Sequence, residues 1–127
     1  MPWEVEYKSE NEFSVALNGK ALSFIFKNKE KYEVVLNKIL DKAQVYARMS
    51  PEDKATLVML IQDSTGKMVG MCGDGANDCA ALKQADAGIS LSEAEASIAA
   101  PFTSKIQDIS CVITLLKEGR AALTTTF

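Results

Sequence analysis

The first clear pattern of hydrophobic and polar positions lies around Asn18-Gly19, which separates two short runs rich in apolar residues. A two-residue loop at this point would place apolar residues opposite one another, as in the pairs Val15 with Leu22 and Phe13 with Phe24. Asn-Gly suits the positive φ angles of a type I′ turn, and apolar pairs across the strands stabilise such a turn. This segment therefore predicts a β-hairpin.

The pattern then changes to a helix, followed by alternating strands and helices. Residues 29–40 carry apolar side chains at helical spacing. Ser50-Pro51 predicts a helix start, because serine caps the free N–H groups and proline fits the first helical position. The other predicted elements are strands over 44–47, 68–72 and 87–91 and helices over 77–85 and 109–123.

Strands interleaved with helices are typical of an α/β fold with a parallel, Rossmann-like sheet flanked by helices. We expect a single domain over residues 1–127, with the hairpin and a helix in 12–40 and the parallel α/β part in 43–127. At 127 residues, the chain is long enough for one such domain but not for several.

Composition mainly excludes classes of function. The net charge is −3, so the chain lacks the basic surface expected of a nucleic-acid partner. No apolar run approaches the ~20 residues that cross a bilayer. The chain has no histidine, and its three cysteines match no zinc motif; we expect them to be reduced, mostly buried thiols.

The segment richest in chemical groups is Gly73-Asp74-Gly75-Ala76-Asn77-Asp78, which follows a predicted buried strand and opens a predicted helix. This position is the carboxyl edge of the sheet, where α/β proteins bind ligands. Asp74 and Asp78 supply the hard oxygen ligands that suit Mg²⁺. Gly75 lets the backbone approach a phosphate closely, and Asn77 adds a neutral donor near the positive end of the helix.

Two alternatives compete with a metal site in this loop. A dinucleotide-binding loop would need a small residue where Asp78 stands, and a carboxylate there would face a pyrophosphate. A purely structural turn would also contain Asp and Gly, but two glycines, two aspartates and an asparagine in six residues exceed what a turn needs. The metal site is the favoured interpretation.

Lys54 is the second candidate for a role in catalysis. It lies in the first turn of the predicted helix that begins after Ser50, just beyond a strand, so it could project over the same sheet edge. There its ammonium group could neutralise a phosphoryl group. The competing interpretation is a solvated lysine that balances Glu52 and Asp53. The metal loop some twenty residues later favours the phosphoryl role.

The segments 48–54 and 73–78 together resemble the phosphorylation domain of P-type ATPases, which has the haloacid-dehalogenase-like fold. The runs 88–93 and 96–105, which end in Pro101-Phe102-Thr103-Ser104-Lys105, are similar to the eukaryotic type-V-B branch. That branch is associated with polyamine transport in endosomal and lysosomal membranes. The resemblance is close over 45–123 and looser before residue 45.

The resemblance implies a role for each matching residue. Asp74 and Asp78 would hold magnesium, Asn77 would contact the phosphoryl group, and Lys54 would stabilise it. Glu118-Gly119-Arg120 would lie just before a transmembrane helix, so the final helix would link phosphorylation to membrane movement. ATP would be the substrate, and the partners would be the nucleotide-binding, actuator and transmembrane domains of a multi-pass protein.

The family's Asp-Lys-Thr-Gly-Thr nucleophile motif does not occur in the chain. Asp41-Lys42 continues differently, and Asp63-Ser64-Thr65-Gly66 follows residues with helical spacing, so Asp63 should end a helix instead of a strand. We therefore expect the chain to be an inactive part of an ATP-driven transporter, on its cytosolic side. A small phosphatase of the same superfamily and a non-catalytic binding or regulatory module are the alternatives.

Overall fold

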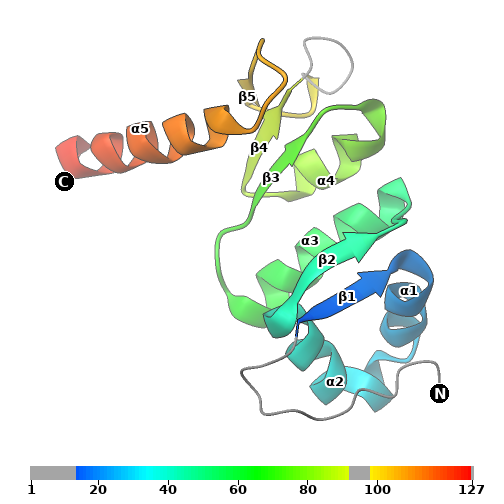
Figure 1. The fold of residues 1–127 in the computed structure, drawn as a ribbon. Helices are drawn as coiled ribbons and strands as arrows, with labels where there is room; N and C mark the ends of the chain where they lie inside the picture. Colours follow the sequence, from blue (N-terminus) through cyan, green and yellow to red (C-terminus); the bar gives the residue numbers. More distant parts are fainter. Residues whose placement is uncertain (1–13, 92–97, 127) are drawn as a thin grey trace. The chain divides into compact units, whose positions relative to one another are not determined.

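A computed structural model describes residues 14–91 and 98–126 of the chain (Figure 1). Contacts between residues divide the chain into two compact units, 1–49 and 50–127. Each unit contains its own parallel strands and helices, which confirms the predicted α/β class.

The first unit has the order strand, helix, helix, strand. The elements are β1 (Val15–Asn18), α1 (Gly19–Lys27), α2 (Lys29–Lys42) and β2 (Ala43–Ala47). β1 and β2 lie side by side and run parallel, with Leu17 opposite Tyr46. The predicted helix over 29–40 and strand over 44–47 are confirmed within a few residues.

The predicted hairpin at Asn18-Gly19 is wrong, although a strand pair does form in this unit. The Asn18 side-chain oxygen accepts a hydrogen bond from the Ala21 N–H at 2.9 Å, so Asn18 caps α1 instead of making a turn. Leu22 and Ile25 are buried, and their spacing of three residues belongs to a helix. Asparagine is favoured both in tight turns and at helix N-caps, and the helical spacing of the apolar residues decides between them here.

The second unit begins with α3 (Pro51–Thr65), whose start follows the predicted signals. Ser50 Oγ accepts from the Asp53 N–H at 3.0 Å, and the Asp53 carboxylate accepts from the Ser50 N–H at 3.1 Å, which completes a capping box. The helix ends at Gly66, which has a φ of 64°. Asp63 therefore lies inside a helix, as expected.

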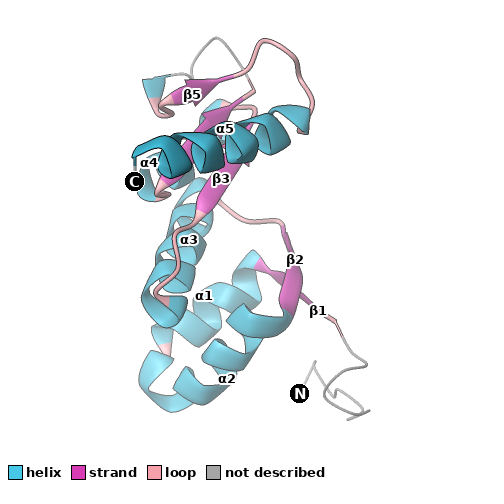
Figure 2. Cartoon of the chain, turned by 90° about the vertical axis from the view of Figure 1, so that its left-hand side faces the viewer, coloured by secondary structure: helices cyan, strands magenta, loops and turns pink. Residues whose placement is uncertain are grey.

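A three-stranded parallel sheet forms the rest of the second unit. Its strands are β3 (Gly70–Gly73), β4 (Ala87–Ser90) and β5 (Phe102–Thr103), in that order across the sheet. The 3₁₀ turn η1 (Ala76–Asp78) and α4 (Cys79–Gln84) connect β3 to β4, and α5 (Ser110–Thr126) follows β5. α4 and α5 lie on opposite sides of β3 and β4 (Figures 1 and 2).

The core of this unit lies where α3 and α4 pack together. Its buried apolar residues are Val58, Leu60, Ala81, Leu82 and Ile89. Burial of this apolar surface is the main force that holds α4 against the sheet. Among the described residues, no helix has both the length and the apolar content needed to cross a membrane.

Candidate phosphate and magnesium site

The predicted metal loop lies at the carboxyl end of β3, where the sequence placed it. Gly73 ends the strand, Asp74 follows it, and the loop closes in η1 with Asp78. Asp78 is buried, at 7% exposure, although it carries a carboxylate. One of its oxygens, Oδ2, accepts a hydrogen bond from the Asp74 N–H at 3.2 Å.

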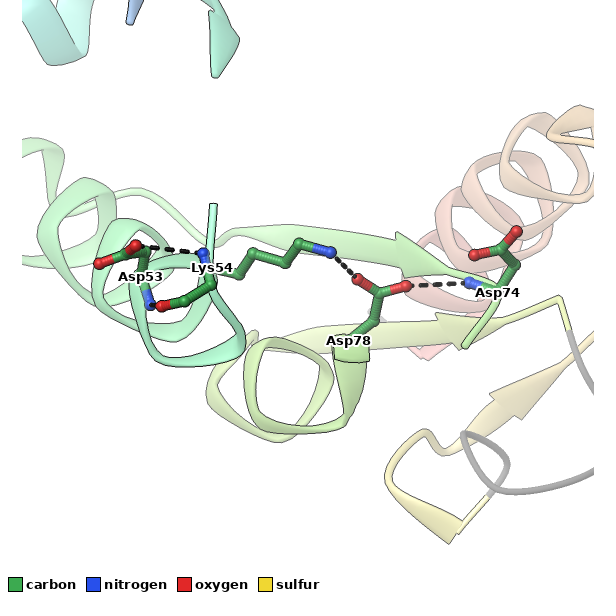
Figure 3. A network of polar contacts seen from close by, with 5 residues as sticks. Asp53, Lys54, Asp74 and Asp78 are labelled. Carbon is green, nitrogen blue, oxygen red and sulfur yellow. Dashed lines mark hydrogen bonds and ion pairs between the residues drawn. The ribbon is translucent and has the colours of Figure 1, made fainter. Parts of the chain in front are cut away.

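The other Asp78 oxygen makes an ion pair with Lys54, with 2.7 Å between Oδ1 and Nζ (Figure 3). Counting side-chain atoms only, Lys54 is 32% exposed and Asp78 is 10% exposed. The two residues are 24 positions apart, so this pair joins the start of α3 to the loop after β3. A buried carboxylate needs such a partner, because an unpaired buried charge is strongly destabilising.

The base of the Lys54 side chain is held by the helix start. Its backbone N–H donates to the Ser50 carbonyl at 3.0 Å, in the same turn as the capping box. The competing interpretation, in which Lys54 only balances the charges of Glu52 and Asp53, does not account for the ion pair between Lys54 and Asp78. Asp53 serves the cap, and the Lys54 ammonium pairs with Asp78.

Glycine is required at Gly73 by the position of Asp78. A Cβ atom at Gly73 would lie 2.6 Å from the Asp78 Cβ and 2.7 Å from its Oδ2, which is too close for any real contact. Gly75 differs, because its φ of −144° is open to any residue and no atom would meet a Cβ within 4 Å. The open space at Gly75 is compatible with close approach of a ligand to the backbone.

The remaining predicted site residues lie at the surface of the same loop. The Asp74 side chain is exposed and is directed away from the Asp78 carboxylate (Figure 3). Asn77 lies in η1, also exposed. The structure thus brings the Lys54 and Asp78 side chains together and joins Asp78 to the backbone of Asp74, with Gly75 and Asn77 in the loop between the two aspartates. The pairing of Lys54 with Asp78 was not predicted.

The donor set of this loop fits magnesium in part. Asp74 and Asp78 provide hard carboxylate oxygens, and Mg²⁺ commonly takes one or two carboxylates together with waters and substrate phosphate. Within the described ranges, no group of three or more His, Cys, Asp or Glu side chains could hold a metal. A magnesium ion held by these two carboxylates would also take water and substrate phosphate as ligands.

The thiol of Cys72, next to Gly73, is electrostatically linked to this site. Burial raises the pKa of Cys72, and the neighbouring Cys111 thiol and the charges of Asp74 and Asp78 raise it further. Cys72, Cys79 and Cys111 form no disulfide and are half-buried, so they are more exposed than the mostly buried thiols expected from the sequence.

Comparison with known proteins relates the chain to a group of transporters, although no family model matches it. It is 52% identical over 124 residues to the vacuolar cation-transporting ATPase YPK9 of Saccharomyces cerevisiae, covering 97% of the chain. It is also 52% identical over 115 residues to the polyamine-transporting ATPase 13A3 of Mus musculus, covering 91% of the chain. The chain resembles P-type ATPases of the 13A branch.

A third relative of this 13A branch is the probable cation-transporting ATPase 13A4 of Homo sapiens, 52% identical over 118 residues, or 93% of the chain. The chain spans only 8%, 9% and 10% of the lengths of these three ATPases. The type V resemblance noted in the sequence motifs is therefore confirmed over most of the chain.

Proposed function

We propose that this chain is the magnesium- and phosphate-binding part of the phosphorylation domain of an ATP-driven, cation- or polyamine-transporting P-type ATPase. The observation that carries the proposal is the ion pair of Lys54 with Asp78, which also accepts a hydrogen bond from the Asp74 N–H, at the carboxyl edge of a parallel sheet. The transporter would be a multi-pass protein of an endosomal, lysosomal or other endomembrane. This domain would face the cytosol and work with nucleotide-binding, actuator and transmembrane domains.

In this proposal each side chain of the site has one task. Asp74 and Asp78 would hold magnesium, which would supply positive charge to offset the charge of the phosphate. Lys54 would place its ammonium beside the transferred phosphoryl group, where it stabilises charge in the transition state. Asn77 and the backbone at Gly75 would contact the phosphate oxygens. Phosphoryl transfer depends mainly on such positioning and charge stabilisation.

The nucleophile would come from outside this chain. Within the described ranges, Asp74 is the only carboxylate that directly follows a strand, and it is assigned to the metal. Asp41 lies in α2 and Asp63 in α3, so neither stands at a strand end. An aspartate nucleophile supplied by another segment would form an aspartyl-phosphate and divide one difficult step into two.

A phosphorylation assay distinguishes this proposal from the alternative of a small phosphatase that carries its own nucleophile. Incubated with radiolabelled ATP and magnesium and then quenched in acid, the isolated chain is expected to carry no label, because the proposed nucleophile belongs to another segment. A full-length transporter containing it should be labelled at an upstream aspartate. Stoichiometric labelling of the isolated chain that is lost in Asp63→Asn would overturn the proposal and favour the phosphatase.

Magnesium should bind the isolated chain weakly, at millimolar-range concentrations, because two carboxylates and water supply only part of a magnesium site. In an NMR titration with MgCl₂, the largest shifts are expected at Asp74 and Asp78, and Asp74→Asn should reduce them. Asp63→Asn, a change of the same kind in α3, is the matched control and should leave the titration unchanged. Largest shifts elsewhere, insensitive to Asp74→Asn, would contradict the assigned ligands.

A further inference from the structure

Two of the three cysteines come from different elements and meet on one face of the sheet of the second unit. Cys72 lies on β3, and its register partner on β4 is Ile89. Residues paired across neighbouring strands direct their side chains to the same face of a sheet. The Cys72 and Ile89 side chains therefore share one face.

Cys111 reaches this face from the first turn of α5. Together with Ile89, Phe102 and Leu115 it lines an open cavity of about 350 Å³ between α5 and the strands β4 and β5. Its Sγ donates a hydrogen bond to the Asp108 carbonyl at 3.6 Å, which holds the thiol at the start of the helix. In Figure 2, α5 crosses in front of β3, in agreement with this placement.

The two thiols are neighbours, because Ile89 is the register partner of Cys72 and also lines the cavity with Cys111. In agreement with this placement, Cys111 contributes to the raised pKa of Cys72. Cys79 provides an internal comparison. It begins α4, which lies on the opposite side of β3 and β4 from α5 (Figures 1 and 2). All three cysteines are half-buried, so their different neighbours, and not their exposure, separate Cys79 from the other two.

We propose that Cys72 and Cys111 form a redox-sensitive pair, which closes to a disulfide when the chain meets a small disulfide oxidant such as oxidised glutathione. One cysteine thiolate would attack a sulfur of the oxidant, forming a mixed disulfide and releasing one glutathione thiolate. The second cysteine, after losing its proton, would attack the protein sulfur and release the other glutathione. In total, two protein thiols become one disulfide, and one oxidised glutathione becomes two reduced glutathiones.

Closure would tie the first turn of α5 to the strand that leads into Asp74. Neither thiol is in a disulfide. On the cytosolic side, where the proposed function places this domain, disulfides are usually transient and redox-sensing. The pairing depends only on the positions of β3, β4 and α5. Any effect on transport rests in addition on the proposed function, so the test below measures the bond itself.

The test is oxidation of the full chain with oxidised glutathione, followed by blocking of free thiols and peptide mapping by mass spectrometry without reduction. We expect the Cys72–Cys111 link to exceed either link to Cys79 by about tenfold, because a disulfide needs closely placed Cα atoms and Cys79 lies on the other side of β3 and β4. The same oxidation in urea is the control for folding, and there the preference should disappear.

Single cysteine-to-serine variants test whether the disulfide comes from this specific pair or from unspecific oxidation of any thiol. Cys79→Ser should keep the Cys72–Cys111 link. Cys72→Ser should end with a glutathione adduct on Cys111, and Cys111→Ser with a glutathione adduct on Cys72. The proposal is overturned if native and urea-treated chains give the same pattern of links. Preferential links to Cys79, links between two chains, or stable glutathione adducts on both Cys72 and Cys111 of the Cys79→Ser variant would overturn it equally.

Discussion

Replacement of Lys54 by alanine in a full-length transporter that contains this chain is expected to lower ATP turnover by about a thousandfold or more. The ammonium is proposed to act on charge that develops in the transition state, and loss of such a group removes several kcal/mol of stabilisation. At ~1.4 kcal/mol per tenfold in rate, this corresponds to the expected loss. Asp74→Asn, which removes a proposed magnesium ligand, should have an effect of similar size.

The measurement is the steady-state ATPase rate of purified transporter, with thermal unfolding recorded for each variant. Lys83→Ala removes an exposed lysine from α4 and is the matched control, with a near-normal rate expected. Lys54→Ala should also lower the melting temperature, because the buried Asp78 loses its counter-ion. Near-normal turnover in a folded Lys54→Ala protein would exclude Lys54 from the chemistry.

The second large effect is expected at Gly73. In Gly73→Ala the new Cβ would lie within 3 Å of the Asp78 side chain, so a shift there would disturb the contacts of Asp78 with Lys54 and the Asp74 N–H. Overpacking of this kind typically costs about 1–3 kcal/mol of unfolding free energy. In the full-length transporter, displacement of Asp78 should also reduce turnover severely.

Urea unfolding of the chain, followed by circular dichroism, measures the stability part of this prediction. Gly75→Ala is the matched control, because a Cβ there meets no atom and the backbone is not in the left-handed region. Its free energy of unfolding should change by no more than about 0.5 kcal/mol. Equal stabilities for the two variants would show that the close contact between Gly73 and Asp78 does not exist in solution.

Local signals in the sequence predicted most of the second unit. Ser50 and Pro51 indicate a helix start by satisfying backbone groups within one turn, and such signals need no knowledge of distant residues. The alternation of apolar runs with helical stripes predicted the parallel α/β class for the same reason. The short strand β5 was missed, because Phe102-Thr103 is too brief to show any periodicity.

Features that depend on distant partners could not be predicted in this way. Asn18-Gly19 fits both a tight turn and a helix cap, and packing of Leu22 and Ile25 selects the cap. The ion pair of Lys54 with Asp78 joins residues 24 positions apart, so only the folded chain reveals it. The sequence placed both residues at the sheet edge but assigned them to different ligands.

The Lys54–Asp78 ion pair has a thermodynamic consequence under the proposed assignment. Each residue is the other's counter-ion while no ligand is bound. A cation that takes Asp78 would release the Lys54 ammonium toward a phosphoryl group, and an anion that takes Lys54 would release Asp78 toward a cation. Linkage requires these two effects to be equal, so each ligand should raise affinity for the other by the same factor. The pair would thus make the site cooperative, favouring joint occupancy over either ligand alone.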